Sequence, residues 1–259
     1  MDDFEKSFEK KIEKFAGYMA ASENIVFFGG AGVSTESGIP DFRSAGGLYK
    51  DKGGADEAPP EVMLSRTYFF ENTERFFKFY KTKMLYPDAK PGEAHHVLAK
   101  LEEKGKLAAV ITQNIDGLHQ AAGSKNVVEL HGSVKRNSCI GCGKKFELDY
   151  IMSCEGIPYC DTCGGIVKPE VTLYEEQLDP GAIDAALHHI AEADMLIVGG
   201  TSLLVNPAAS FVGRFFYGDK YGGKRSAIIN KSETSYDSMF DISFRSGIGG
   251  TLSAAYAKL

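Results

Sequence analysis

Residues 29–43 read Gly-Gly-Ala-Gly-Val-Ser-Thr-Glu-Ser-Gly-Ile-Pro-Asp-Phe-Arg, the most informative stretch of the chain. It follows the apolar run Ile25-Val26-Phe27-Phe28, which predicts a buried strand that leads directly into a glycine-rich turn. Peptide N–H groups in such a turn can close on a phosphate, so the stretch indicates a nucleotide site. Gly30 and Gly32 followed by Thr35 form a degenerate dinucleotide fingerprint, because a residue with a hydroxyl and a branched Cβ replaces the third glycine.

The residues after this turn distinguish the chain from a dehydrogenase. A dehydrogenase continues into a helix and a second strand that ends in an acidic ribose-binding residue, whereas Gly38-Ile39-Pro40 interrupts any helix here. Asp41-Phe42-Arg43 then brings together a carboxylate, an aromatic ring and a guanidinium, which suits a site that contacts both phosphate and a flat aromatic ring. The alternative is a loop in which glycine and proline only satisfy turns and Phe42 is an ordinary core ring.

Apolar runs and helical repeats alternate along the rest of the chain, which is the pattern of an α/β fold with an open parallel sheet. Strands are predicted at 107–111, 127–130, 195–198 and 227–229, and amphipathic helices at 4–19, 94–101 and 183–190. Two stretches break this pattern: residues 44–92 are rich in Phe and Tyr, and residues 133–170 contain every cysteine. We therefore predict a Rossmann-like domain of residues 1–43, 93–132 and 171–259, and a smaller inserted domain that combines a helical module (44–92) with a cysteine module (133–170).

The composition limits the class of protein. The chain has 259 residues, of which 43% are hydrophobic and 25% charged, enough to bury a large core. No apolar run approaches the roughly 20 residues that span a bilayer, and the charged N-terminus does not resemble a secretory signal, so we expect a cytoplasmic enzyme. The net charge of −6 disfavours contact with a nucleic-acid backbone and is compatible with basic, lysine-bearing substrates.

The cysteines form two Cys-x-x-Cys pairs, Cys139 with Cys142 and Cys160 with Cys163, and 18 residues separate Cys142 from Cys160. Each pair lies in a glycine-containing knuckle that can direct two thiolates at one ion, and four thiolates complete a tetrahedron around zinc. Because four cysteines leave no open position for water, the predicted zinc is structural. The alternatives are disulfides, which a reducing cytoplasm disfavours, and a redox motif, which rarely occurs twice at such a spacing. Cys154 lies between the pairs without a partner cysteine.

Polar residues follow the strand predicted at 107–111, at its carboxyl end, where open α/β sheets bind their ligands. They are Gln113, Asn114 and Asp116, with Ile115 between them. Amides and a carboxylate at this place can hydrogen-bond a ribose and a carboxamide. One of these side chains could instead cap a helix that begins at Gly117.

Three other strand ends carry polar residues of the same kind. His131 follows the strand at 127–130, and a neutral imidazole is suited to act as general base for a ribose hydroxyl. Gly199-Gly200-Thr201-Ser202 follows the strand at 195–198, and Asn230 takes the place of the acidic ribose-binding residue of a dehydrogenase. Ordinary turn chemistry is the alternative for the last two.

Taken together, these motifs resemble the sirtuins, the NAD-dependent protein-lysine deacylases, over nearly the whole chain and in the same order. The resemblance implies a Rossmann-like large domain and a small domain with zinc and helices, with NAD and acyl-lysine entering one cleft from opposite sides. It implies deacetylation of protein acetyl-lysine with release of nicotinamide and 2′-O-acetyl-ADP-ribose. Protein or peptide substrates would bind as an extended strand.

The resemblance also implies roles for individual residues. His131 would be the catalytic base, and Asn114 would position the ribose or water. Phe42, Ile115 and Asp116 would line the nicotinamide pocket. The full set of implied NAD contacts is Ala31, Thr35, Phe42, Arg43, Gln113, Ile115, Asp116, His131, Thr201, Ser202, Asn230 and Ile248, the last in a turn after the final strand.

The chain departs from the sirtuin pattern where that family binds its substrate. The family has Arg-Pro-x-Val-Val-x-Phe-Gly-Glu where residues 168–176 read Lys-Pro-Glu-Val-Thr-Leu-Tyr-Glu-Glu, so Tyr174 and Glu175 replace Phe-Gly and we expect a differently shaped peptide groove. Members that remove acidic acyl groups carry Tyr-x-x-Arg, and Tyr80 with Lys83 keeps the ring and a cation without the guanidinium fork. This segment could also be an ordinary amphipathic helix. Acetyl is the expected acyl group, and a preference for longer or acidic acyl groups is the alternative.

Two other functions compete with deacetylation. An ADP-ribosyltransferase would use the same NAD site with a protein nucleophile in place of the amide oxygen, but simple transfer gives His131 no step to perform. A zinc-ribbon module that binds nucleic acid without catalysis is the second, and the acidic charge balance disfavours it.

Overall fold

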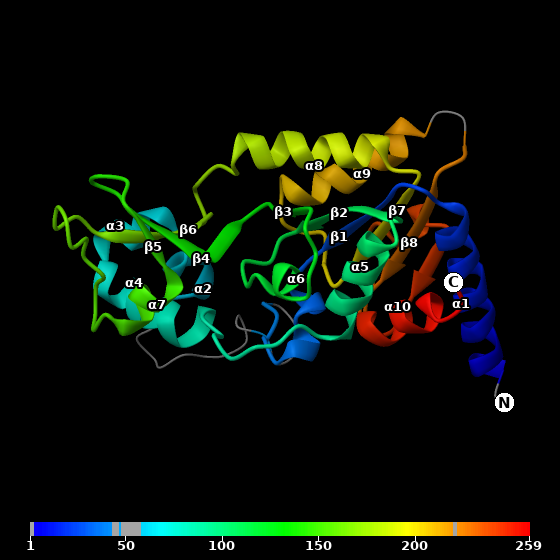
Figure 1. The fold of residues 1–259 in the computed structure, drawn as a ribbon, viewed down its shortest axis with the longest axis horizontal. Helices are drawn as coiled ribbons and strands as arrows, with labels where there is room; N and C mark the ends of the chain where they lie inside the picture. Colours follow the sequence, from blue (N-terminus) through cyan, green and yellow to red (C-terminus); the bar gives the residue numbers. More distant parts are fainter. Residues whose placement is uncertain (1–2, 43–46, 48–57, 220–221) are drawn as a thin grey trace.

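The computed structural model describes residues 3–42, 47, 58–219 and 222–259. Arg43 and a large part of the 44–92 module therefore lie outside the described residues. The molecule is elongated, with a larger part that holds both chain ends and a smaller part at the opposite end (Figure 1).

The larger part is built on a six-stranded sheet in which every strand is parallel to its neighbours. The strands are β1 (Ile25–Gly29), β2 (Leu107–Thr112), β3 (Val127–Glu129), β7 (Met195–Gly199), β8 (Arg225–Ile229) and β9 (Ile242–Phe244). Their order across the sheet is β3-β2-β1-β7-β8-β9, the order of a Rossmann-like, doubly wound sheet. The chain winds in opposite directions on either side of the β1–β7 boundary, and such folds bind ligands at the carboxyl ends of these strands. The predicted fold class and the predicted strands are confirmed.

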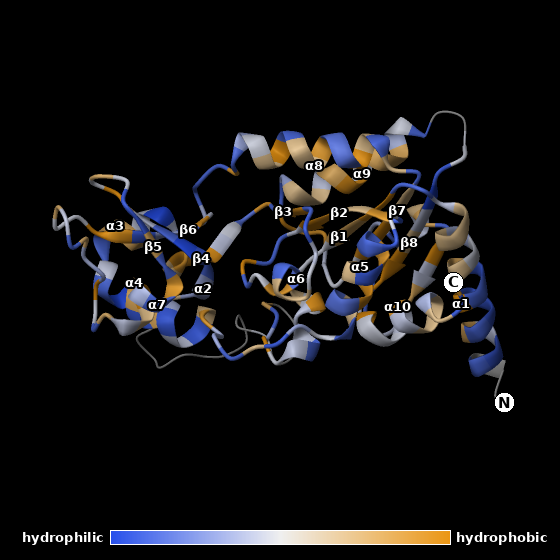
Figure 2. Ribbon diagram, viewed as in Figure 1, coloured by the Kyte–Doolittle hydropathy of each residue, from blue (hydrophilic) through white to orange (hydrophobic). Residues whose placement is uncertain are grey.

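Helices cover both faces of this sheet because successive strand residues point to opposite sides. Ile25 and Phe27 pack into one core with α1 (Asp3–Ala21), α5 (Glu93–Glu103) and α10 (Ile248–Tyr256). Val26 and Phe28 pack into the other core with α8 (Pro180–Glu192) and α9 (Ala208–Gly218). The strands are apolar on both faces, as a parallel sheet buried between two helix layers requires (Figure 2).

The smaller part combines a three-stranded antiparallel sheet with short helices. Its strands are β4 (Gly132–Cys139), β5 (Lys145–Glu147) and β6 (Val167–Val171), in the order β5-β4-β6. Helix α7 (Leu148–Ser153) follows β5 in the sequence. Its other helices are α2 (Pro60–Met63), α3 (Arg66–Glu71), α4 (Thr73–Phe79) and a π-helical turn (Tyr80–Met84). Rings from the helical segment, such as Phe69 and Phe76, share one core with Phe146 and Val167 of the cysteine segment. This common core supports a single small domain, and its boundaries at 44–92 and 133–170 stay a prediction.

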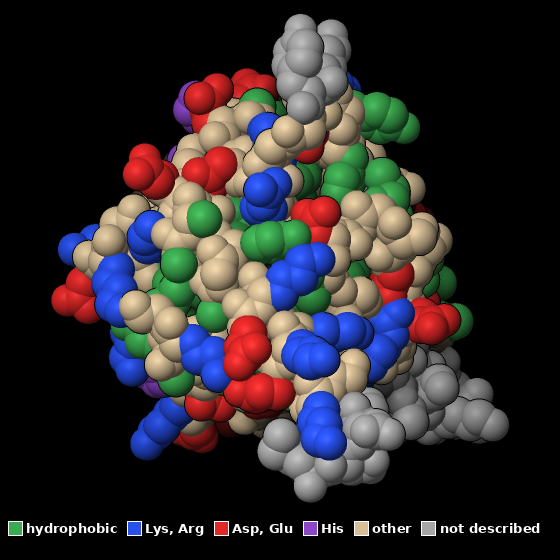
Figure 3. All heavy atoms as spheres, turned by 90° about the vertical axis from the view of Figure 1, so that its right-hand side faces the viewer, with side chains coloured by type: hydrophobic (Ala, Val, Ile, Leu, Met, Phe, Trp, Pro, Cys, Tyr) green, Lys and Arg blue, Asp and Glu red, His purple; other side chains and the backbone are tan. Residues whose placement is uncertain are grey.

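The outer surface of the larger part carries charges of both signs. Figure 3 shows Lys and Arg side chains interspersed with Asp and Glu over the end that holds α1. Within the described ranges, no helix is long and apolar enough to cross a membrane.

Candidate active site

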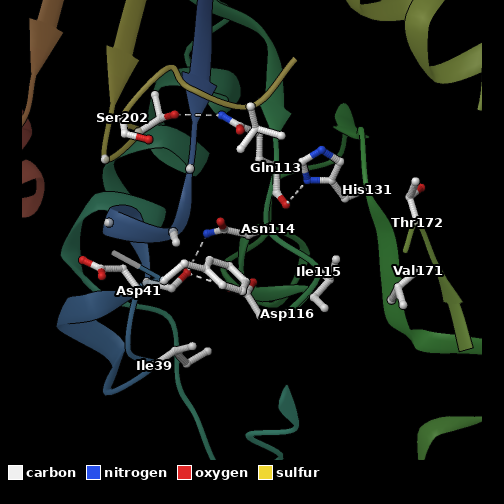
Figure 4. Close-up of a pocket in the computed structure, with 18 of the residues that line it drawn as sticks. Ile39, Asp41, Gln113, Asn114, Ile115, Asp116, His131, Val171, Thr172 and Ser202 are labelled. Carbon is white, nitrogen blue, oxygen red and sulfur yellow. Dashed lines mark hydrogen bonds between the residues drawn. The ribbon is translucent and has the colours of Figure 1, made fainter. Parts of the chain in front are cut away.

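A cleft of about 1040 Å³ lies between the two parts, at the carboxyl ends of the central strands. Its lining comes from the loops after β1, β2, β7 and β8 on one side, and from the π-helical turn and the segment after β6 on the other. Figure 4 shows residues of these loops directed into the cleft, with Gln113, Asn114 and Asp116 near the sheet and Val171 and Thr172 across from them. Distant stretches of sequence thus meet at one site.

The glycine-rich turn forms the wall next to β1. After Gly30 the chain makes two short 3-10 turns, Ala31–Val33 and Thr35–Ser37, and Gly38 reverses it with a φ of +82°. A Cβ on Gly32 would lie 2.7 Å from the Cα of Gly200, whose own φ is +61°. The loops after β1 and β7 can therefore approach only with glycine at both positions. Thr35 Oγ1 donates to Gly32 O at 3.0 Å and thereby closes the turn.

The loop after β7 is held by two amide side chains. Asn230 Oδ1 accepts from Thr201 N at 3.1 Å, and Asn230 Nδ2 donates to Thr201 O at 2.9 Å. Gln113 Nε2 donates to Thr201 Oγ1 at 3.0 Å. Thr201 is thus fixed at both its backbone and its hydroxyl. In this structure Asn230 orders the loop, a function that its position at a strand end did not indicate.

A buried hydrogen-bond chain joins the loops after β1 and β2. Asn114 Nδ2 donates to Ser34 Oγ at 2.9 Å, and Ser34 Oγ donates to Asp116 Oδ2 at 2.7 Å. The other oxygen, Asp116 Oδ1, accepts from Leu118 N at 2.9 Å. Both oxygens of Asp116 are therefore oriented before any ligand binds. Ser34 is 1% exposed and is a site residue that the sequence analysis missed.

His131 is held in one tautomer by the backbone. Its Nδ1 lies 2.9 Å from Gln113 O, and because a carbonyl only accepts, Nδ1 carries the proton and Nε2 keeps its lone pair. Burial lowers the pKa of His131 below its usual range, while the bond to Gln113 O opposes that shift. The imidazole is therefore neutral at pH 7. Figure 4 shows the ring between Gln113 and Thr172, facing the cleft.

The remaining predicted residues divide into three groups. Ala31, Phe42, Ile115 and Ser202 line the cleft, as do the other described residues that the sequence predicts for the NAD site: Thr35, Gln113, Asn114, Asp116, His131, Thr201 and Asn230. Ile248 also lines it but is the first residue of α10 and 4% exposed, so the expected turn is a helix start. Arg43 lies outside the described residues.

The four predicted zinc ligands converge at one point of the small domain. The Sγ atoms of Cys139, Cys142, Cys160 and Cys163 all lie within 4.8 Å of one another. Cys139 Sγ is 3.4 Å from Cys163 Sγ, and Cys142 Sγ is 3.7 Å from Cys160 Sγ, too far for disulfides. With Zn–S bonds of about 2.3 Å, a tetrahedron has edges of about 3.8 Å, so the donor set fits a structural zinc ion.

Comparison with known proteins places the chain among enzymes of one kind. The model of the Sir2 family matches residues 30–207. An NAD-dependent protein deacetylase of Clostridium acetobutylicum is 58% identical over 93% of this chain and 96% of its own length. One of Clostridium perfringens is 53% identical over 94% of this chain and 98% of its own. Among solved structures, a Sir2–p53 peptide–NAD⁺ complex is 35% identical with a TM-score of 0.83, covering 95% of this chain and 98% of that one.

Proposed function

This chain belongs to the Sir2 family, and we infer from that membership and from the geometry of the cleft that it is an NAD-dependent protein deacetylase. The observation that carries the assignment is the single-tautomer, neutral His131 beside the pre-oriented Asn114–Ser34–Asp116 chain, in a cleft closed by the glycine-rich turn. The family supplies the NAD dependence, and the described residues supply the means to bind NAD and to move one proton.

We assign the predicted NAD contacts to three regions of the cleft. The glycine-rich turn and Thr201 offer backbone N–H groups and hydroxyls for phosphate and ribose. Ile115 and Asp116 are assigned to the nicotinamide ring and its carboxamide group, because Ser34 and Leu118 hold the Asp116 carboxylate in a fixed orientation. NAD supplies an activated ribose carbon whose leaving group is nicotinamide. His131 Nε2 then accepts the proton of a ribose hydroxyl, and the N–H on Nδ1 shares the resulting positive charge with Gln113 O.

The substrate is proposed to be an acetyl-lysine protein or peptide bound as an extended strand. Related solved structures contain peptides, a p53 peptide in one and a propionylated peptide in another. In this chain, residues 172–175 after β6 line one side of the cleft, and Leu204 and Val205 line it from the loop after β7. A peptide laid between the two segments would therefore contact both of them.

Transfer of the ADP-ribosyl group to protein is the second candidate function. Incubation of the enzyme with an acetylated peptide and NAD labelled in its adenine ring separates the two. We expect the label in a soluble O-acetyl-ADP-ribose and the peptide to lose its acetyl group. Label retained on protein, with the peptide unchanged, would instead assign a transferase.

The acyl preference follows from the π-helical turn. Tyr80 is fully buried, its hydroxyl has no partner among the described residues, and burial raises its pKa. Lys83, on the same turn, lines the cleft and offers a point charge that cannot grip a carboxylate bidentately. We expect acetyl-lysine to be preferred over succinyl-lysine. Lys83→Arg should shift the ratio of kcat/KM values towards succinyl by about 10-fold, or about 1.4 kcal/mol.

Lys81→Arg is the matched control for this prediction. Lys81 Nζ donates to Cys154 O and Gly156 O, away from the cleft, so its replacement should leave the ratio unchanged. The measurement is kcat/KM for matched acetyl and succinyl peptides. A wild-type preference for succinyl, or an equal shift in both variants, would show that Lys83 does not read the acyl group.

The remaining proposals concern location and partners. We propose a cytoplasmic enzyme, because a reducing compartment keeps the four cysteines of the proposed zinc site from forming disulfides. We propose no direct contact with nucleic acid, since the net charge is −6 and the end shown in Figure 3 carries both signs of charge.

A further inference from the structure

Residues 172–176, named here the groove segment, connect the catalytic base to the small domain. Thr172 N donates to the backbone O of His131 at 2.9 Å. Two residues later, Tyr174 N donates to Leu64 O at 3.0 Å, and Tyr174 O accepts from Arg66 N at 2.9 Å. The segment is therefore tied to His131 at one end and to the start of α3 at the other.

Glu175 occupies an unusual backbone conformation in this segment. Its φ is +73°, in the left-handed region where a side chain with a Cβ is strained. Its side chain is exposed, so no burial of apolar surface compensates for the strain. A conformation of this kind persists only when neighbouring contacts hold it.

The carboxylate of Glu175 makes such contacts across the chain. Glu175 Oε2 accepts from Thr67 N at 2.9 Å and from Thr67 Oγ1 at 2.7 Å. Thr67 is the second residue of α3, so its N–H is one of those that a helix cannot satisfy internally. These two bonds from Thr67 lower the pKa of Glu175 below its ordinary range, so the group is a carboxylate at neutral pH.

The following residue fixes the other side of the same turn. Glu176 Oε2 accepts from Leu173 N at 2.9 Å and from Lys168 Nζ at 3.1 Å, in a partly buried ion pair. Glu176 thus holds the segment to β6, while Glu175 holds it to α3. The two carboxylates therefore fix the position of the groove segment relative to α3 and β6.

We propose that Glu175 is a positioning residue for the acyl-peptide substrate: its bonds to Thr67 latch the groove segment to α3 and fix the path of the segment that borders the bound peptide. The proposal rests on the proposed function, because it requires a peptide along this segment. Most of the residues assigned to NAD, among them Thr35, Thr201 and Asn230, come from loops on the sheet side of the cleft, whereas His131 contacts the groove segment. We therefore expect the latch to change peptide binding far more than NAD binding.

Four variants separate the latch from simple strain. Glu175→Ala removes both bonds but keeps a Cβ, and we expect the KM for the acetyl peptide to rise about fivefold, the effect of a pair of exposed charge-assisted bonds. Glu175→Gly also removes the bonds but relieves the strain, so its peptide KM should match that of Glu175→Ala while its melting temperature is higher. Glu175→Gln keeps an acceptor oxygen and should restore most of the affinity. Thr67→Val, which loses one donor, should raise the KM about twofold.

The double variant Glu175→Ala with Thr67→Val tests the coupling. If the two residues act through one contact, its peptide KM should be no higher than that of Glu175→Ala. Glu155→Ala, at an exposed carboxylate of the small domain outside the cleft, is the matched control and should behave as wild type. The KM for NAD should stay within twofold or so of wild type in every variant.

The outcomes are distinct. An unchanged peptide KM in Glu175→Ala and Thr67→Val, or a wild-type KM in Glu175→Gly, would overturn the latch. Equal rises in the KM values for peptide and NAD, with a lower melting temperature, would show general destabilisation instead. If the wild type fails to deacetylate any peptide, the proposed function fails, and amide exchange at Thr67 decides the latch: faster exchange in Glu175→Ala supports it, and unchanged exchange refutes it.

Discussion

Replacement of His131 by alanine should lower kcat for an acetylated peptide by a factor on the order of 10² to 10⁴ while NAD binding and folding are retained. The reason is the position of the ring. Nδ1 is protonated by its contact with Gln113 O, so Nε2 is the only nitrogen that can accept a proton, and no other described histidine lines the cleft. The measurement is steady-state kinetics, with NAD affinity and melting temperature as controls. A variant that deacetylates at nearly the wild-type rate would contradict the assignment.

The pH profile of the wild type gives an independent check on the same residue. Burial lowers the pKa of His131 below the ordinary value of 6.5, and the neutral base is the active form. Activity that depends on this base is present above its folded-state pKa and is lost as the pH falls through it. We therefore expect kcat/KM to fall at acid pH with a midpoint below pH 6.5. A midpoint above pH 6.5 would contradict a buried His131 that is neutral at pH 7.

Cys142→Ala should remove the bound zinc, lower the melting temperature and abolish deacetylation. Closed four-cysteine sites contribute folding free energy directly, and this one joins the last residue of β4, Cys139, to Cys142, Cys160 and Cys163. Cys139 and Cys160 of the cluster belong to the same core as Phe69 and Phe76, so loss of the ion should loosen the helices that border the cleft.

The control for this prediction is Cys154→Ala. Cys154 does not belong to the cluster, and its replacement should leave the zinc content and most of the activity intact. Metal analysis should give one zinc per chain for the wild type. A purified protein without zinc, or one that keeps full activity after chelation removes the ion, would refute a structural metal.

The parts that could be predicted from the sequence are those with local signals. Apolar runs such as Ile25-Val26-Phe27-Phe28 predict strands that are buried on both faces. The two Cys-x-x-Cys pairs predict that their four thiols lie together. Polar residues at the ends of predicted strands come together because parallel strands end at one edge of the sheet. For this reason Gln113 and Thr201 could be placed in one site and lie in contact.

The parts that could not be predicted depend on contacts between distant residues. Ser34 orients Asp116, 82 positions further along the chain, and nothing in its neighbourhood shows that partner. Thr67 and Glu175 are 108 positions apart, and the left-handed backbone of Glu175 is not visible in a sequence. Ile248, between two glycines, looks like part of a turn, yet it begins a helix whose Gly249 N–H donates to Glu36 Oε1 at 3.3 Å.

NAD-dependent deacetylation fixes the stoichiometry of the products, which can be measured directly. The enzyme is incubated with an acetyl-lysine peptide and NAD, and nicotinamide, deacetylated peptide and O-acetyl-ADP-ribose are quantified by mass spectrometry during the first turnovers. We expect the three products to form in equal amounts and none of them to form without the acetylated peptide. Nicotinamide release without acetylated peptide, or deacetylation that yields free acetate and leaves NAD intact, would contradict this expectation.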